Sequence, residues 1–353
     1  MRMKVSLQFS GPARYRAKSV AVMCRAIADV GLRRALKGPR CASWNLAMEV
    51  GTEIARRQLL AAFETGNVED ARSYLDSVAM PSPALLRVST ENVVAENLKG
   101  TWFVPSKLEA SKTDSGLSIL YLHGGGYSFY PRSFYDNLAA LIALSADCRL
   151  FAAEYRLSPE HKYPAQLEDA TRAYRWMLEQ GTDPQRLVVL GDSAGGNLTL
   201  ALLLSLPGLR LPPPALAVCL SPATDFVGSE ETAPETSERD WITLEMALRW
   251  ADWYCSPAER SDPLVSPVNA DLTHLPPVYV QAGGAEILLP GIEEFVRRAK
   301  QQGADVTLET WPDMNHDFQA FGSEVPQSAE AIRRIGEVIA SRCGRNHGCS
   351  VAG

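Results

Sequence analysis

Residues 187–197 read LVVLGDSAGGN, and this stretch decides the fold. Its first four residues are aliphatic, as in a buried strand, and a helical pattern starts at Gly195. Between them lies Gly191-Asp192-Ser193-Ala194-Gly195, a G-x-S-x-G sequence in the order strand, tight turn, helix. Glycine is needed at both flanks because a Cβ would clash in so sharp a turn. The turn presents the Ser193 hydroxyl at the positive end of the helix, so we expect Ser193 to be a nucleophile.

Strand and helix patterns alternate through most of the chain. After helical patterns at 16–37 and 43–65, strands are predicted at 85–93, 100–104, 117–122, 150–154, 187–190, 215–220, 278–282 and 306–310. Helices are predicted between and after them, at 134–146, 164–180, 195–206, 243–254, 291–302 and 328–342. This alternation predicts an α/β fold with a mostly parallel central sheet flanked by helices. In such sheets, ligands bind outside the carboxyl ends of the strands.

One segment interrupts the alternation. Between Thr224 and Leu275, about 50 residues separate two strands, where a simple crossover needs far fewer. We expect residues 1–80 to form an N-terminal helical cap and residues 81–345 to form the catalytic domain. The segment at about 225–270 would add a cap insertion, and 346–353 would be a flexible tail.

A serine hydroxyl needs a base, and the base needs an orienting acid. Of the five histidines, only His316 follows a late strand, in the segment WPDMNHD (311–317). The first carboxylate after the predicted strand 278–282 is Glu286. The chain order serine, acid, histidine is the order of α/β-hydrolases. The pattern therefore predicts a catalytic triad of Ser193, Glu286 and His316.

A glycine cluster follows the predicted strand 117–122, in His123-Gly124-Gly125-Gly126-Tyr127. Successive glycines leave backbone N–H groups uncovered, so that they could converge on one oxygen, as the tetrahedral intermediate of acyl transfer requires. We expect the oxyanion hole to consist of Gly125, Gly126 and Ala194. The alternative is a flexible loop, and His123 is expected to brace the turn.

Five segments together resemble the hormone-sensitive-lipase-like family of α/β-hydrolases. They are HGGGY (123–127), YRLSPEHKYPAQLEDA (155–170), GDSAGGN (191–197), GGAEILL (283–289) and MNHDF (314–318). The resemblance covers roughly residues 85–340. It implies carboxylesterase activity on short-to-medium acyl esters, no cofactor, and a helical cap built partly from the N-terminus. It also implies the same oxyanion hole, Gly125, Gly126 and Ala194.

The chain departs from the family pattern at the acid. The family usually has Asp followed by a further Asp-Glu, whereas here Glu286 holds the position and Pro290-Gly291 follows. This variant is similar to the branch that includes lactone hydrolases and acetyl hydrolases. Hydrolysis of lactones, or of acetyl esters or amides, therefore stays open with the same triad. A catalytically dead ligand-binding module is the alternative of another class, but such modules typically lose the serine or the histidine.

Other residues have structural interpretations. Met246, Trp250 and Trp253 form an apolar stripe for which core or cap packing is the default. The alternative is that this stripe and Tyr127 line a substrate pocket. Asp192 is expected to brace its loop and Asp169 to be structural.

Composition narrows the class of protein. The net charge of −6 argues against nucleic-acid binding. Seven cysteines, an odd number, indicate reduced thiols in a cytoplasmic protein, with Cys148 and Cys219 in the core. No stretch approaches the roughly 20 apolar residues of a membrane span, and the start lacks the apolar segment of a signal peptide. No cluster has metal-ligand spacing, so we expect no metal.

The N-terminal segment is basic. Residues 1–40 contain ten Lys or Arg and one acid, and Val20, Met23, Ile27 and Val30 recur at helical spacing. The default is a cap helix packed on the domain. Weak contact with an anionic membrane surface and an organelle-targeting segment are the alternatives. We expect a small-molecule ester or lactone as the substrate, and a homodimer stays open.

Overall fold

A computed structural model describes residues 7–79, 81–111, 116–129, 132–227 and 238–343. Its centre is an eight-stranded sheet in the order β10-β9-β8-β7-β5-β6-β4-β3. All neighbouring pairs are parallel except β3–β4 and β4–β6. The strands are β3 (Val88–Ala95), β4 (Leu98–Pro105), β5 (Ser118–Leu122), β6 (Arg149–Glu154), β7 (Leu187–Asp192), β8 (Leu216–Leu220), β9 (Val278–Gly283) and β10 (Val306–Trp311).

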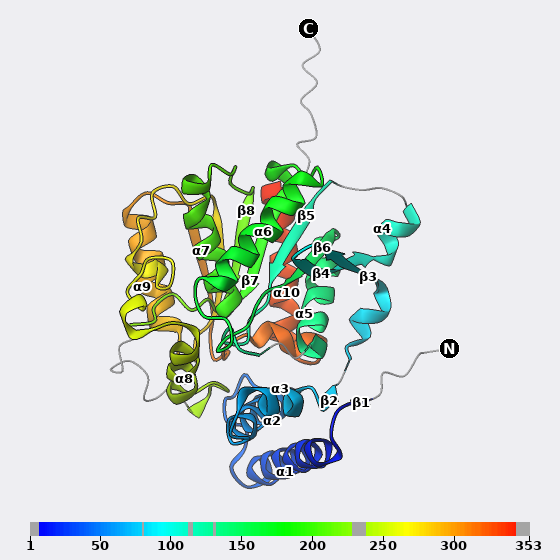
Figure 1. Ribbon diagram of the computed structural model, residues 1–353. Helices are drawn as coiled ribbons and strands as arrows, with labels where there is room; N and C mark the ends of the chain where they lie inside the picture. The colour runs from blue at the N-terminus through cyan, green and yellow to red at the C-terminus, as the bar shows by residue number, and fades with distance from the viewer. Residues whose placement is uncertain (1–6, 80, 112–115, 130–131, 228–237, 344–353) are drawn as a thin grey trace.

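Helices cover both faces of the sheet (Figure 1). On one face, α6 (Ala165–Glu179), α7 (Ala194–Leu209) and α9 (Leu289–Gln301) share a core with the sheet. On the other face, α5 (Arg132–Ala146) and α10 (Pro326–Cys343) do the same. The central strands β5, β7 and β8 are buried at every residue. This explains why they read as continuous apolar runs without a polar alternation.

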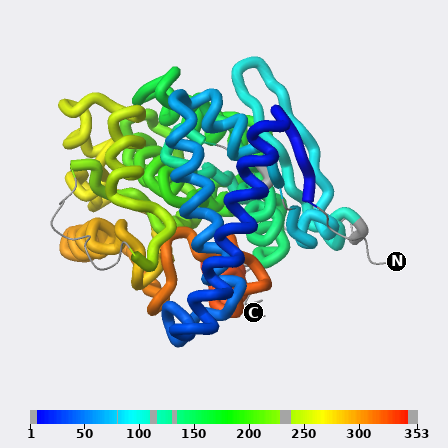
Figure 2. The backbone as a smooth tube through the Cα atoms, turned by 90° about the horizontal axis from the view of Figure 1, so that it is seen from below, coloured from blue at the N-terminus to red at the C-terminus, as the bar shows by residue number. Residues whose placement is uncertain are grey.

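Three N-terminal helices form a cap below the sheet in Figure 1, namely α1 (Ala13–Lys37), α2 (Leu46–Phe63) and α3 (Val68–Leu75). In Figure 2, seen from below, α1 and α2 run side by side across the molecule. Side-chain caps start two of them: Asn45 accepts from Met48 N–H and Asn67 from Asp70 N–H, both at 2.8 Å. A short ribbon, β1 (Gln8–Phe9) with β2 (Val78–Ala79), closes the cap segment.

Helix α8 (Leu244–Tyr254) comes from the predicted insertion and joins the cap. Its Met246 and Trp250 share an apolar cluster with Leu59 of α2 and with Tyr74 of α3. The remaining elements are short: α4 (Ser106–Ser111), η1 (Pro83–Arg87), η2 (Pro184–Arg186), η5 (Pro257–Glu259), η6 (Pro267–Asn269) and η7 (Phe318–Glu324). A cap therefore forms from two distant parts of the chain.

The predicted α/β fold, with a mostly parallel sheet and a cap from two segments, is confirmed. One predicted strand was placed too early, because 83–87 form η1 and β3 begins at Val88. Helices α3 and α4 and the β1–β2 ribbon were not predicted, since such short elements carry little periodicity. The expected boundaries at 80, 81 and 345 stay predictions, and the tail 346–353 lies outside the described residues.

The buried face of α1 differs from the predicted one. Tyr15, Ser19, Ala26 and Val30 are buried, whereas Ile27 is 49% exposed. Small residues such as Ser19 and Ala26 allow α1 to lie close to α2, and of the predicted apolar side chains only Val30 is fully buried on this face. Cys148 and Cys219 are fully buried, as expected. No helix in the described part of the chain is long and apolar enough to cross a bilayer.

The contact between α5 and α10 gives a test of the packing. A Cβ added at Gly336 in α10 would lie 2.3 Å from the main-chain oxygen of Ser145. Ala normally stabilises a helix relative to Gly by roughly 0.5–1 kcal/mol. Here we expect Gly336→Ala to lower the free energy of unfolding by about 1–3 kcal/mol, because the interface is overpacked. Urea denaturation measures the change.

Gly31→Ala is the matched control. Gly31 lies in α1 with no heavy atom within 4 Å of an added Cβ. This substitution should raise the free energy of unfolding by up to ~1 kcal/mol. Equal stabilisation by both substitutions would contradict the close packing of α10 on α5.

Candidate active site

Ser193 occupies a strained turn between β7 and α7. Its φ of 53° and ψ of −119° lie in a region that non-glycine residues rarely populate. An added Cβ at Gly191 would lie 2.1 Å from the Gly195 oxygen, and one at Gly195 would lie 2.0 Å from the Leu122 oxygen. These flanks therefore need glycine, as predicted. The main-chain N–H of Ser193 donates to the Leu220 oxygen at 2.8 Å, which holds the turn against β8.

The three residues of the predicted triad lie together. His316 Nε2 is 2.8 Å from Ser193 Oγ, although 123 residues separate the two in sequence. Glu286 Oε2 is 3.7 Å from His316 Nδ1, an ion-pair distance that is longer than a hydrogen bond. The side chains of His316 and Glu286 are 1% and 0% exposed. They reach Ser193 from loops that follow β10 and β9, at the carboxyl ends of parallel strands.

The imidazole of His316 lies between two carboxylates. Besides Glu286 on the Nδ1 side, Asp317 Oδ2 lies 3.2 Å from Nε2. Burial alone would lower the pKa of His316, but the charges of Asp317 and Glu286 outweigh it and raise the pKa well above the ordinary value. Burial also raises the pKa of Glu286. Asp317 therefore affects the protonation of the ring atom that faces Ser193.

Asp240 connects the two loops that carry Glu286 and His316. Its Oδ1 accepts from the His316 N–H at 3.1 Å, and its Oδ2 accepts from the Ile287 N–H at 2.8 Å. Burial raises the pKa of Asp240 to about 6. Sequence reasoning missed Asp240 and the contact of Asp317 with Nε2. In the sequence, Asp240 is marked only by being an acidic residue shortly before the amphipathic pattern of α8.

Asp192 holds the glycine loop after β5. Its Oδ1 accepts from the Tyr121 hydroxyl at 2.6 Å and from the Gly124 N–H at 3.1 Å, so the expectation that it braces a loop is confirmed. The N–H of Gly124 is used in this way, and Gly125 and Gly126, the donors expected from the sequence, follow it along the loop. They have φ values of 99° and 59°, which favour glycine, and both line the same cavity as Ser193.

His123 is part of the scaffold of this loop. Its Nδ1 lies 2.7 Å from the Gly124 oxygen, and its ring stacks on Tyr155 with the centroids 4.1 Å apart. Burial lowers the pKa of His123 to about 3, so the ring is neutral at pH 7. This environment agrees with the expected bracing role. Asp169 is structural as expected, since it accepts from Arg156 Nε at 2.8 Å and Arg172 Nη1 at 2.6 Å.

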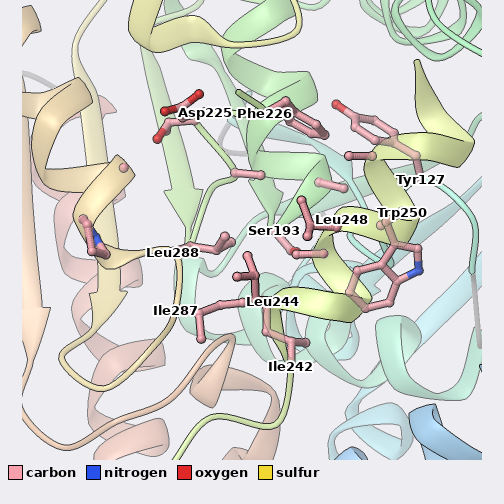
Figure 3. A pocket seen from close by; sticks show the side chains of 18 residues that line it. Tyr127, Ser193, Asp225, Phe226, Ile242, Leu244, Leu248, Trp250, Ile287 and Leu288 are labelled. Carbon is pink, nitrogen blue, oxygen red and sulfur yellow. The ribbon is translucent and has the colours of Figure 1, made fainter. Parts of the chain in front are cut away.

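Two cavities meet at Ser193. The smaller, of about 140 Å³, is lined by Tyr127, Ala194, residues of α8, residues 223–226 after β8, and residues 287–291 at the start of α9 (Figure 3). The larger, of about 620 Å³, lies between the cap helices and the catalytic domain. Among the described ranges, no group of three or more His, Cys, Asp or Glu side chains could hold a metal ion.

The predicted pocket residues separate into two groups. Tyr127 and Trp250 line the smaller cavity. Met246 and Trp253 are not among the described residues that line either cavity. Met246 is buried in the cap cluster, and Trp253 packs on Phe63 with the ring centroids 5.6 Å apart. The cavity meets the neighbouring side of α8, which carries Leu244, Ala247, Leu248 and Ala251, and reaches the predicted stripe only at Trp250.

Comparisons with known proteins show the family to which the chain belongs. Residues 119–320 match the family model described as alpha/beta hydrolase fold. The chain is 36% identical to an acetyl-hydrolase of Streptomyces hygroscopicus, over 65% of this chain and 77% of that relative. It is 31% identical to an ethyl acetate hydrolase of Pseudomonas putida, over 64% of this chain and 73% of that relative.

A solved esterase from the bacterial hormone-sensitive lipase family superposes with a TM-score of 0.77 at 33% identity. The match covers 85% of this chain and 99% of that one. The resemblance inferred from the motifs is thus confirmed. The chain belongs to the α/β-hydrolase fold family, within its hormone-sensitive-lipase-like group.

Proposed function

We propose that this chain is a serine carboxylic-ester hydrolase that acts on short-to-medium acyl esters through an acyl-enzyme on Ser193. The observation that carries the proposal is the 2.8 Å contact between Ser193 Oγ and His316 Nε2 at a strained strand–helix turn. A serine hydroxyl in such contact with a neutral imidazole can lose its proton as it attacks a carbonyl. The relatives named as an acetyl-hydrolase and an ethyl acetate hydrolase support this class of reaction.

Each group has a role in the proposed reaction. Ser193 Oγ attacks the ester carbonyl while His316 Nε2 takes its proton. The N–H groups of Gly125, Gly126 and Ala194 stabilise the negative oxygen of the tetrahedral intermediate. His316 then returns the proton to the leaving alcohol, and water releases the acid from Ser193 by the same steps.

We assign Glu286 as the acid of the triad. It faces His316 Nδ1, whereas Asp317 faces Nε2, the atom that must exchange a proton with Ser193. A carboxylate at Nδ1 orients the ring and stabilises the imidazolium without competing for that proton. The 3.7 Å separation is compatible with this role, since catalytic hydrogen bonds are often long in unliganded structures and tighten with substrate.

Acetyl-ester hydrolysis is the specific form of this activity that the structure favours. The smaller cavity at Ser193, about 140 Å³, leaves little room on one side of the reacting carbon. Three other expectations stay predictions: a cytoplasmic location, a homodimer, and weak contact of the basic N-terminal helix with an anionic membrane surface.

Replacement of the nucleophile tests the assignment directly. Ser193→Ala should lower kcat for p-nitrophenyl acetate by at least ~10³-fold, because the attacking atom is absent. A fluorophosphonate probe should label the unmodified protein once, at Ser193, as read by peptide mass spectrometry. Ser205→Ala in α7 is the control and should keep both activity and labelling. Turnover by purified, folded Ser193→Ala would contradict the assignment.

The triad acid is tested by paired substitutions. Glu286→Gln keeps the shape of the side chain but removes its charge and supports the wrong imidazole tautomer, so kcat should fall by as much as ~10⁴-fold. Glu293→Gln, on the exposed side of α9, should change kcat by less than about threefold. Steady-state kinetics of both variants, with circular dichroism to confirm folding, decide the matter. The reverse order of effects would show that the acid is misassigned.

The raised pKa of His316 predicts the pH dependence. Only the neutral imidazole accepts the Ser193 proton, so kcat/KM should be lost as the pH falls through this raised pKa. Asp317→Asn removes a negative charge from beside Nε2 and should move the midpoint of the profile to lower pH. Asp313→Asn, in the same loop but 41% exposed, is the control and should leave the midpoint in place. An unchanged or higher midpoint for Asp317→Asn would contradict the role of its charge.

A further inference from the structure

The two cavities at Ser193 differ in which catalytic groups they contact. Among the described residues, His316 and Asp317 line the larger cavity and not the smaller one. Of the proposed oxyanion donors, Ala194 lines only the smaller cavity and Gly125 lines only the larger one. Ser193 and Gly126 belong to both. The reacting carbonyl would therefore lie where the cavities meet, with one part of the ester in each.

The position of His316 decides which part lies where. The leaving alkoxide must receive its proton from His316 Nε2, so the alcohol oxygen has to lie beside that atom. The alcohol then continues into the cavity whose wall His316 forms, which is the larger one. The acyl chain points away from His316 into the smaller cavity. This step rests on the proposed ester hydrolysis and on nothing else about the substrate.

The smaller cavity is mostly apolar, although Thr224 and Asp225 also line it. In Figure 3, Ser193 is surrounded by Leu244, Leu248, Ile287 and Leu288, with the indole of Trp250 beside them. Its volume is about 140 Å³. An apolar cavity of about 150 Å³ holds a molecule the size of benzene. An acetyl, propanoyl or butanoyl group fits this space, and a chain of eight carbons exceeds it.

The larger cavity is long and mostly apolar. It extends from the catalytic residues to the cap, with a volume of about 620 Å³, within the range of roughly 300–1,000 Å³ typical of sites for drug-sized ligands. Its apolar lining includes Met23, Ile54, Leu59, Phe129, Phe134 and Leu141.

Two amide side chains that line the larger cavity are engaged within the protein. Gln58 Nε2 donates to Ser19 Oγ at 2.8 Å, and the Gln58 oxygen accepts from the Tyr74 hydroxyl. Asn137 Oδ1 accepts from the Ser82 N–H at 2.6 Å. Because these groups already have partners, an apolar alcohol would be favoured there over a polar one.

Trp250 separates the two spaces. It lines both cavities, and its ring lies against Gly126 so closely that a Cβ there would be 2.3 Å from the indole. The oxyanion loop and α8 thus pack closely together beside Ser193.

We propose that the preferred substrates are esters of a short acid, from acetyl to about butanoyl, with a long or bulky apolar alcohol. The smaller cavity limits the acid, and the cavity under the cap binds the alcohol. Specificity for the alcohol would then come from α1 and α2 together with α5 and η7, and specificity for the acid from α8 and from residues 287–291 at the start of α9.

A pair of isomeric esters tests this proposal. Octyl acetate and ethyl octanoate have the same formula and nearly the same hydrophobicity, but they exchange the long chain between the alcohol and the acid. We expect kcat/KM to be at least ~10-fold higher for octyl acetate, a difference of ~1.4 kcal/mol in barrier. The proposal would be overturned if kcat/KM for the two esters differed by less than threefold, or if it were higher for ethyl octanoate. A different result would overturn the proposed function instead: the protein hydrolyses neither isomeric ester, does not hydrolyse p-nitrophenyl acetate, and is not labelled at Ser193.

Substitutions in either cavity should lower the ratio of kcat/KM for octyl acetate to kcat/KM for ethyl octanoate. One substitution narrows the cavity for the alcohol, and the other lengthens the cavity for the acid. Ala55→Phe narrows the larger cavity and should lower kcat/KM for octyl acetate at least ~10-fold more than for ethyl octanoate. Leu248→Ala lengthens the smaller cavity and should raise kcat/KM for ethyl octanoate relative to octyl acetate. Ala28→Phe, on the exposed face of α1, is the matched control and should leave the ratio unchanged. If Ala55→Phe does not fold, Leu248→Ala still tests the proposal. An unchanged ratio of kcat/KM for the two esters in Leu248→Ala would contradict the assignment of the acyl chain to the smaller cavity.

Discussion

The close approach of α7 to the end of β5 is the constraint on which the rest of the site depends. Gly195 lies against the Leu122 and His123 oxygens so tightly that an added Cβ would be 2.0 Å and 2.4 Å from them. This contact holds Ser193 in a conformation that costs on the order of 1–3 kcal/mol. Burial of the apolar residues of α7, such as Leu198 and Leu202, offsets the strain, at roughly 1.5–3 kcal/mol each. The same contact places the glycine loop beside Ser193.

Charge is the second feature that the site has to balance. Four carboxylates surround the single imidazole of His316: those of Asp192, Asp240, Glu286 and Asp317. Burial raises the pKa of Asp192, Asp240 and Glu286, because a charged carboxylate is costly where water is excluded. The same carboxylates favour the protonated imidazole. An imidazolium forms in each half of ester hydrolysis, so this electrostatic environment supports the step that needs it.

The catalytic loops and the cap have different roles in the proposed reaction. The residues proposed for the chemistry follow β5, β7, β9 and β10, which are anchored in the two apolar cores of the sheet. The walls that would select the substrate come in part from α1, α2 and α8, which share a separate cluster, and in part from α5 and η7. Asp240 is the point where the two meet, because it precedes α8 and accepts hydrogen bonds from His316 and Ile287. Changes in the cap could therefore alter the substrate while the chemistry stays the same.

The sequence alone determined the order of strands and helices, the turn at Ser193, and the positions of Glu286 and His316. These could be predicted because apolar periodicity and glycine spacing are local, and because parallel strands bring their carboxyl ends to one edge. Only the tertiary structure decided that Asp240 joins two loops, that Asp317 faces Nε2, and that Trp250 rather than Trp253 borders the cavities. Such contacts join residues far apart in the chain or depend on how a helix is rotated against its neighbours. Periodicity shows that a face is buried, but packing against distant elements determines what it is buried against.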